Sequence, residues 1–393
     1  MKKYLTFIIC MTILWSCASQ KPATAPLFRL SQSEYPAFAD DMNYRGLAES
    51  ISQSLKYLRK IPSDRKFSFG TDVYDAAHMI QSLEDFLVFI EKNPSQKETE
   101  KFIRSRYLVY KSIGRDQEGE VLFTGYYEPL LRGSLRETSE YRYPVYGPPT
   151  DMMNVDLSGF SSDLKGKKVI GRIEGDRFLP YYERKEIEQD RVLKGKAPEL
   201  AWVNDPVDLF FLQIQGSGKI ALDSGETINV HYHSKNGRAY KSIGKVLIDE
   251  KKISKEEMSM QKIRQYLREH PEEQNRILNA NPSYVFFSIE KEGPLGAINV
   301  RLTPGRSIAI DKSIFPISGL AFLQTQKPVA APDGSGKVAD WLPFSRFVLN
   351  QDTGGAIKGA GRADIFWGNG EYAEIAAGHL KHTGSLYFLV EKP

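Results

Sequence analysis

The chain has 393 residues, with 53 lysines and arginines against 49 aspartates and glutamates, and a formal net charge of +4. This balance, without an arginine-rich run, gives no support to a nucleic-acid-binding protein, and the length suffices for two domains that each bury a core. Both cysteines, Cys10 and Cys17, lie near the N-terminus, so the body of the protein must be stable without disulfides.

The N-terminus has the pattern of an export signal. Lys2 and Lys3 are followed by an apolar run over residues 5–15. That run is shorter than the roughly 20 apolar residues that a membrane-spanning helix needs. We therefore predict that residues 1–16 are a signal peptide that is removed.

Cys17 stands where that signal would be cut. The preceding Leu-Trp-Ser resembles the bacterial lipobox, although Trp15 is bulky where the motif has a small residue. The resemblance implies lipidation of Cys17 and, because Ala18 follows it, sorting to the outer membrane. Residues 17–35 are small and polar and are interpreted as a lipidated tether. The alternative is an ordinary secretory signal with an incidental cysteine.

Helical periodicity begins after the tether. One apolar stripe is formed at spacings of four, four and three by Leu47, Ile51, Leu55 and Leu58. A second helix is predicted over residues 73–92, and Phe102, Tyr107 and Leu108 suggest a third. We interpret all of these helices as packing elements.

From Val121 onward the pattern changes to short alternating runs between glycines and prolines. Strands are predicted at 121–123, 141–146, 209–214, 228–232, 284–289, 308–310, 347–349 and 386–390. A helical stretch interrupts them at about 237–279, where Ser254 and Glu257 form a capping-box pattern. No glycine-rich phosphate loop follows a strand, which argues against a nucleotide-binding sheet.

The least ordinary stretch runs from Asp352 to Gly368 and reads DTGGAIKGAGRADIFWG. Its glycines allow positive φ angles and close approach of a neighbouring chain. Taken alone, such a stretch is also compatible with a hairpin whose aspartates only hold turns.

This stretch resembles the three-aspartate (3D) domain, with Asp311, Asp352 and Asp364 as the three aspartates. Further blocks in the chain narrow the resemblance to the membrane-bound lytic murein transglycosylase A (MltA) family. They are LFTGYYEP at 122–129, QIQGSG at 213–218, GRAY at 237–240, NPSYVFF at 281–287, GPLG at 293–296 and LTPGRS at 302–307.

The resemblance implies a mainly β protein: a double-psi β-barrel domain, an inserted second β-rich domain and a few N-terminal helices. The barrel domain would comprise residues 36–129, with the N-terminal helices, and 286–393. The inserted domain would comprise residues 130–285. A groove between the two domains would bind the substrate.

The implied activity is cleavage of the β-1,4 bond between MurNAc and GlcNAc in peptidoglycan, with formation of 1,6-anhydro-MurNAc. Asp364 would be the single acid and base. An ordinary aspartate, with a pKa of about 3.9, is ionised at neutral pH, so this role needs burial to raise the pKa. Strand alternation makes Phe366 the expected neighbour on the same face.

Saccharide grooves combine polar groups with aromatic faces. The resemblance places such groups at Thr124, Gly125, Tyr126, Gln215, Ser217 and Asp352. Because adjacent residues in a strand face opposite ways, only one of Tyr126 and Tyr127 is expected to reach substrate. Asp311 and Asp352 are expected to act mainly in structure. Lys358 and Arg362 are candidates for binding substrate carboxylates, with solvent-exposed charge as the alternative.

Glu128 is a candidate second carboxyl, although its position before Pro129 favours a strand-ending role. We expect no metal site and no cofactor. The expected partners are peptidoglycan glycan strands, the membrane through the lipid at Cys17, and cell-wall synthesis or division complexes, at the periplasmic face of the outer membrane. Two other hypotheses stay open: a non-catalytic peptidoglycan-binding lipoprotein on the same fold, and a hydrolase that uses water.

Overall fold

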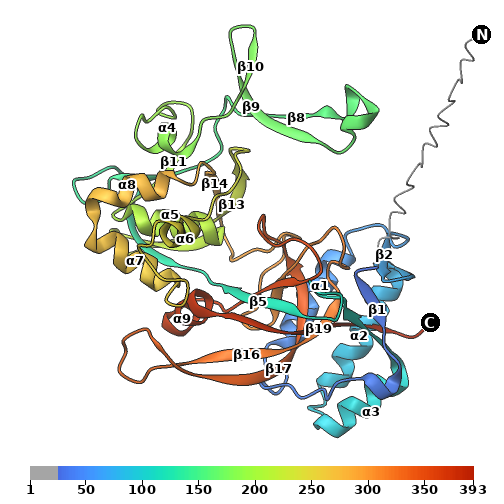
Figure 1. Ribbon diagram of the computed structural model, residues 1–393. Helices are drawn as coiled ribbons and strands as arrows, with labels where there is room; N and C mark the ends of the chain where they lie inside the picture. The colour runs from blue at the N-terminus through green and yellow to red at the C-terminus, as the bar shows by residue number, and fades with distance from the viewer. Residues whose placement is uncertain (1–24) are drawn as a thin grey trace, which may run out of the picture.

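A computed structural model describes residues 25–393. The predicted signal peptide, Cys17 and the first part of the tether lie outside the described residues. Figure 1 shows a barrel in the lower half of the molecule and a second sheet with its own helices above it. No helix within the described residues is long and apolar enough to cross a membrane.

The barrel is a closed ring of six strands. Its order is β19, β16, β17, β15, β18 and β5, and β5 pairs again with β19. The strands are β5 (Val121–Tyr126), β15 (Ser307–Ala309), β16 (Leu320–Ala330), β17 (Val338–Asp352), β18 (Arg362–Phe366) and β19 (Lys381–Glu391). The expected mainly β class with a barrel is therefore confirmed, and β5 joins strands that lie far later in the chain.

The N-terminal segment extends and covers this barrel. β4 (Tyr107–Ser112) pairs with β19, and β1 (Leu27–Arg29) pairs with β4. The remaining elements are η1 (Gln32–Glu34), α1 (Leu47–Leu58), a hairpin of β2 (Lys66–Phe69) and β3 (Asp72–Asp75), α2 (Ala76–Ile90) and α3 (Gln96–Arg106). The predicted apolar stripe of α1 is confirmed, since all four of its residues are buried in the core shared with the barrel.

A buried ion pair ties this segment to the barrel. The Arg306 guanidinium donates to both carboxylate oxygens of Asp40, at 2.6 and 2.8 Å, and both side chains are almost fully buried. Two parallel bonds of this kind fix orientation as well as distance. They hold the loop before α1 against the start of β15.

The second sheet has the order β14, β13, β12, β6, β11 and β7. These strands are β6 (Leu130–Ser134), β7 (Tyr143–Tyr146), β11 (Glu199–Val203), β12 (Ser217–Leu222), β13 (Thr227–Lys235) and β14 (Val285–Glu290). Its helices are α4 (Arg184–Glu188), α5 (Pro206–Gln215), α6 (Ile243–Asp249), α7 (Met260–Glu269) and α8 (Pro271–Asn279). This sheet is enclosed in sequence between β5 and β15 of the barrel.

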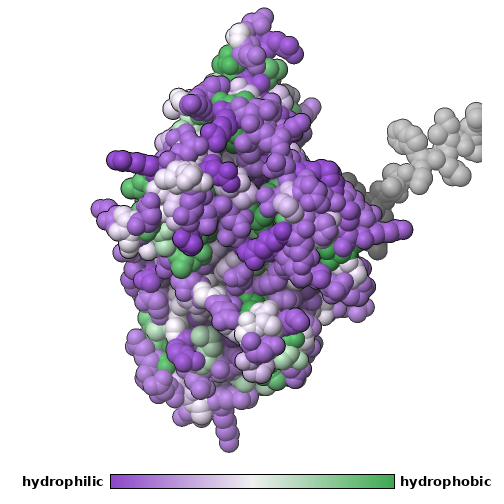
Figure 2. Space-filling view, turned by 90° about the vertical axis from the view of Figure 1, so that its left-hand side faces the viewer, coloured by the Kyte–Doolittle hydropathy of each residue, from purple (hydrophilic) through white to green (hydrophobic). Residues whose placement is uncertain are grey.

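A small sheet projects from this upper part. It comprises β8 (Met153–Asp156), η2 (Leu157–Gly159), η3 (Ser162–Leu164), β9 (Lys168–Glu174) and β10 (Arg177–Pro180). Figure 2 shows the projection at the top of the molecule, where apolar side chains stand among hydrophilic ones. Exposed Ile173 and Phe178 are register partners on one face of it.

The strand predicted at 209–214 is wrong, because these residues form helix α5. Asp205 caps the helix by accepting from the backbone amides of Val207 and Asp208, Pro206 opens it, and Gly216 ends it at φ +81°. Most of the helix is buried, so its sequence is an apolar run without the periodicity that separates helix from strand.

Two smaller predictions also need correction. The predicted third helix exists as α3, but it ends at Arg106. Tyr107 and Leu108 begin strand β4 instead. Ser254 and Glu257 do bond to each other, but helix α7 begins at Met260 with Ser259 as its cap. In each case the helical pattern is real and the boundary is displaced.

Candidate active site

Asp364 lies at the middle of β18, between two neighbouring strands. Its parallel partner on β5 is Thr124, and its antiparallel partner on β15 is Ala309. The flanking Ala363 and Ile365 are fully buried in the barrel interior. Because side chains alternate along a strand, Asp364 stands on the outer face, where its side chain is 17% exposed.

Two polar side chains contact the Asp364 carboxylate. The Thr124 hydroxyl donates a hydrogen bond to its Oδ1. The Arg362 guanidinium lies at 3.4 Å through Nε and also donates to Thr124 Oγ1 at 3.0 Å. Burial raises the pKa of Asp364, and the charge of Arg362 and the Thr124 hydrogen bond only partly oppose it. The carboxyl is thus better at keeping a proton than an exposed aspartate.

Asp352, the last residue of β17, lies close to the same face. The Tyr126 hydroxyl donates to its Oδ2 at 2.8 Å, and the amides of Ala297 and Thr353 donate to its Oδ1 at 3.0 and 2.8 Å. Burial nevertheless raises the pKa of Asp352 to about 6, and the charge of Asp364 contributes to the increase. Asp352 and Asp364 are therefore neighbouring carboxyls that both have raised pKa values, and the Tyr126 hydroxyl bonds to Asp352.

The two tyrosines of β5 do face opposite ways. Tyr126 packs its ring on Phe366, with the centroids 5.2 Å apart, and reaches Asp352. Tyr127 points to the other side, where its hydroxyl lies 3.4 Å from the Arg264 guanidinium. Phe366 lies on the same face of β18 as Asp364, as alternation predicts, and its ring supports Tyr126.

Asp311 has a different environment. Its carboxylate accepts from the amide and hydroxyl of Ser313, at 3.1 and 2.6 Å, and from the amide of Gly359 at 2.9 Å. Although burial acts to raise it, these donors and the charge of Lys358 hold the pKa of Asp311 below its usual value. Asp311 is built to stay ionised and to fasten the glycine-rich loop.

Three other predicted residues do not contact this cluster. A Cβ at Gly125 would lie 2.6 Å from Trp367 Nε1, so this glycine permits tight packing on the inner face of β5. Gln215 accepts from the Tyr127 amide at 3.0 Å through Oε1. Ser217 is buried within the second sheet, as the register partner of His231.

Glu128 continues the outward row of β5 after Thr124 and Tyr126. It is only 2% exposed, and its Oε2 lies 3.2 Å from the Asn369 amide nitrogen and 3.4 Å from Lys219 Nζ. It thereby links the barrel to the second sheet. Alternation along β5 predicts that Glu128 lies on the same face as Thr124 and Tyr126. Ala297, in contrast, contacts Asp352 only through its backbone amide, so its side chain gave no signal in the sequence.

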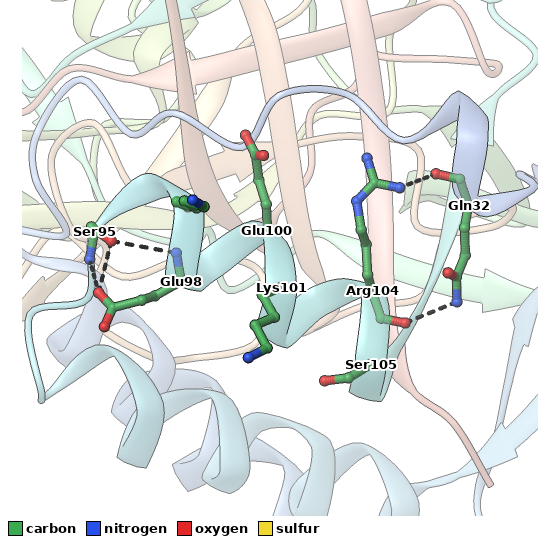
Figure 3. A pocket seen from close by; sticks show the side chains of 8 residues that line it. Gln32, Ser95, Glu98, Glu100, Lys101, Arg104 and Ser105 are labelled. Atoms are coloured by element: carbon green, nitrogen blue, oxygen red, sulfur yellow. Dashed lines mark hydrogen bonds between the residues drawn. The ribbon is translucent and has the colours of Figure 1, made fainter.

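Two hollows of the described surface are not lined by Asp311, Asp352 or Asp364. One of about 880 Å³ lies on the outside of α3, where Gln32 and Arg104 bond to each other (Figure 3). Another of about 310 Å³ lies behind Tyr127, between Arg264 of α7 and Glu374 of α9 (Glu371–His379). Among residues 25–393, no group of three or more histidine, cysteine, aspartate or glutamate side chains could hold a metal ion.

Comparison with known proteins matches two family models in this order along the chain. The MltA specific insert domain matches residues 122–288, and the 3D domain matches residues 306–390. Membrane-bound lytic murein transglycosylase A of Vibrio cholerae is 33% identical over 279 residues, which cover 70% of this chain and 67% of that protein. The Escherichia coli K12 protein of the same name is 34% identical over 283 residues, covering 71% and 68%.

Solved structures agree with this similarity. The crystal structure of a membrane-bound lytic murein transglycosylase from Agrobacterium tumefaciens has a TM-score of 0.75 at 29% identity, covering 93% of this chain and 97% of that one. The crystal structure of E. coli MltA with bound chitohexaose has a TM-score of 0.73 at 27% identity, covering 94% and 96%.

Proposed function

Because the chain belongs to the membrane-bound lytic murein transglycosylase A family and is a peptidoglycan-cleaving lytic transglycosylase, we propose that Asp364 carries its reaction as the single acid and base. One observation carries this proposal. The Asp364 carboxyl has a raised pKa and is also partly exposed on the outer face of the barrel. An acid must hold its proton and still reach the substrate, and this carboxyl meets both conditions.

In the first step, the protonated Asp364 carboxyl donates its proton to the oxygen that bridges MurNAc and GlcNAc. The bond from C1 of MurNAc to that oxygen breaks, and positive charge develops at C1. GlcNAc leaves with a hydroxyl. Asp364 is left as a carboxylate, and the positive charge of Arg362 together with the Thr124 hydrogen bond stabilises this form.

In the second step, the same carboxylate takes the proton from the C6 hydroxyl of MurNAc while the C6 oxygen attacks C1. This closes the 1,6-anhydro ring and returns Asp364 to its acid form, so no water is consumed. Glycosidases that use water or a covalent intermediate need a second carboxyl. An intramolecular nucleophile has an effective concentration that makes this second group unnecessary.

The other predicted site residues are assigned four supporting roles. Thr124 orients the carboxylate, and Tyr126 with Asp352 lines the adjoining face that we assign to the sugar. Gln215 holds the backbone at Tyr127. Gly125 and Ser217 are assigned to the shape of the groove through their packing positions.

We propose a barrel domain and an insert with boundaries close to those expected from the sequence, residues 36–129 and 286–393 for the barrel and 130–285 for the insert. Two boundaries need correction. β14 (Val285–Glu290) pairs with β13 and therefore belongs to the insert, and β1 (Leu27–Arg29), inside the predicted tether, pairs with β4 and therefore belongs to the barrel.

The protein is further proposed to be anchored by a lipid at Cys17 to the periplasmic face of the outer membrane, where cell-wall synthesis or division complexes would be its partners. The membrane-bound names of its relatives support the location. The chitohexaose bound to E. coli MltA supports a glycan strand as the ligand.

The test is mass spectrometry of the fragments released from purified sacculi by the wild type and by Asp364→Asn. We expect anhydro-MurNAc ends from the wild type and none from the variant. Fragments that carry one added water would identify a hydrolase, with Asp352 as the first candidate for the second carboxyl. Binding to sacculi without any release by the wild type would identify a non-catalytic wall-binding protein.

A further inference from the structure

Arg362 stands two residues before Asp364, on the same outer face of β18. Its side chain is 32% exposed, about twice the exposed fraction of Asp364, which is 17%. One nitrogen, Nη2, donates to Thr124 Oγ1 at 3.0 Å. The guanidinium thus borders the proposed catalytic carboxyl and is open to solvent.

The contact between Arg362 and Asp364 is loose. The Nε and Nη2 atoms lie 3.4 and 3.5 Å from Asp364 Oδ1, at the outer limit for a hydrogen bond. Within residues 25–393, Nη1 has no hydrogen-bond partner. Arginine has five donors in a planar fork that matches a carboxylate, and the N–H groups of Nη1 are unused here.

A second cation, Lys358, lies in the loop before β18 and has a different carboxyl as its neighbour. Lys358 is exposed, and its charge acts on Asp311. The main influences on the pKa values of Asp364 and Asp352 come from other groups. Lys358 is therefore a natural control for Arg362, because it has the same charge, lies in the loop just before β18 and has no contact with Asp364.

The substrate creates an electrostatic problem at this face. Asp364 and Asp352 are both carboxyls, and peptidoglycan strands bring carboxylates of their own, on the lactyl arm of MurNAc or on the peptide attached to it. Like charges brought together at a partly buried site repel each other strongly. Arg362 is the cation placed to offset this repulsion once Asp364 has given up its proton.

We propose that Arg362 binds a carboxylate of the muramyl residue at the cleavage site, through the donors that are free in the unliganded protein. This inference rests on the proposed function and deepens it, because it names the chemical feature that separates MurNAc polymers from uncharged β-1,4 glycans. The carboxylate is either the free lactyl group or a group of the attached peptide.

Binding of a substrate carboxylate to Arg362 would also raise the pKa of Asp364. The groups that face Asp364 are Arg362, Thr124, and the Tyr126–Asp352 pair. When a substrate carboxylate pairs with Arg362, the stabilisation of ionised Asp364 by this cation is weakened but not lost, and the carboxyl keeps its proton more firmly. The right substrate would therefore help to prepare the acid that cleaves it.

The experiment compares three substrates: strands stripped of peptides by an amidase, the same strands with their lactyl carboxylates converted to methylamides, and peptide-bearing strands. The enzymes are the wild type, Arg362→Gln, Arg362→Lys and Lys358→Gln, each checked by thermal unfolding. The measured quantities are kcat/KM and its pH dependence.

We expect the wild type and Lys358→Gln to prefer at least one carboxylate-bearing substrate over the methylamide about tenfold, the usual scale of a charge-assisted hydrogen bond. Arg362→Gln should abolish that preference, and Arg362→Lys should keep part of it. On the methylamide, Arg362→Gln should stay active to higher pH, because loss of the cation raises the pKa of Asp364. Preference for stripped strands identifies the lactyl group, and preference for peptide-bearing strands alone identifies the peptide.

Equal rates of the wild type on all three substrates would overturn the inference, as would an equal loss by Arg362→Gln on all of them. If the wild type forms no anhydro ends from any substrate, the proposed function fails instead. The two failures are therefore distinguishable.

Discussion

Asp311 and Asp364 are aspartates of the same barrel with opposite acid–base behaviour. Asp311 accepts three hydrogen bonds from one turn and the glycine-rich loop, and its pKa is lowered. Asp364 accepts one hydrogen bond from the Thr124 hydroxyl and has a more distant contact with the Arg362 guanidinium, and its pKa is raised.

The difference shows that burial alone does not decide the role of a carboxyl. Burial acts to raise the pKa of both carboxyls, and yet Asp311 stays the stronger acid. At Asp311 the hydrogen-bond donors and the charge of Lys358 outweigh the effect of burial, whereas at Asp364 Arg362 and Thr124 do not. One environment makes a structural anchor, and the other leaves a carboxyl that can give up and regain a proton.

The largest effect that sharpens this contrast should come from moving the Asp364 carboxyl without removing it. Asp364→Glu adds one methylene, and a displacement of about 1 Å can cost on the order of 100-fold in rate. We expect kcat to fall by about that factor with anhydro ends still the product, measured by fragment release from sacculi. An unchanged kcat would mean that the position of this carboxyl is not critical.

Asp352→Asn should stabilise the protein at high pH. The folded pKa, about 6, lies above the unfolded value, so the native state binds the proton more tightly, and this stabilising contribution is lost as pH rises from about 4 through 6. We expect the variant to gain about 2 kcal/mol in unfolding free energy at pH 8 and nothing at pH 4. Urea denaturation at both pH values measures this, and a loss of stability at pH 8 would contradict it.

Asp311→Asn should have the opposite sign. A lowered folded pKa contributes stability that is present above the unfolded value and disappears as pH falls through the folded one. The variant should therefore lose about 1–2 kcal/mol at pH 7, because charge-assisted bonds to Ser313 and Gly359 are weakened. The same denaturation series, extended to acid pH, should show the gap closing; a gap independent of pH would refute the explanation.

The smallest effect should come from Gln215→Ala. Gln215 is the last residue of α5 and contacts Tyr127, which directly follows β5. The substitution leaves the Tyr127 amide without its acceptor, which costs about 1 kcal/mol in unfolding free energy. Thermal unfolding measures this, with the exposed Gln265→Ala of α7 as the control. No difference between the two variants would show that the contact adds nothing.

Much of the fold could be predicted from local pattern. The apolar stripe of α1 and parts of the barrel strands β5, β15, β17 and β19 follow from local pattern, whereas β16 and β18 were not among the predicted strands. The prediction fails at α5, because a buried helix and a buried strand have the same composition, although Asp205, Pro206 and Gly216 were the signals that separate them. The closure of β5 on β18 is a contact between distant segments that no local pattern encodes.

The site, like the fold, has features that local sequence predicts and features that depend on distant segments. Asp364 and Arg362 are two residues apart, so strand alternation alone puts them on one face. The bond from Tyr126 to Asp352, and the amide of Ala297 on the same carboxylate, join segments far apart in the chain. The pKa values depend on such tertiary neighbours, and the sequence therefore indicated the acid without showing what tunes it.

The most direct test is to titrate both aspartates in one sample by carbon NMR of labelled carboxyls, assigned with Asp364→Asn and Asp311→Asn. We predict that Asp364 titrates above the ordinary aspartate pKa of about 3.9 and Asp311 below it. Asp364 titrating at or below Asp311 would contradict the central claim that the barrel holds one aspartate ready as an acid and the other permanently charged.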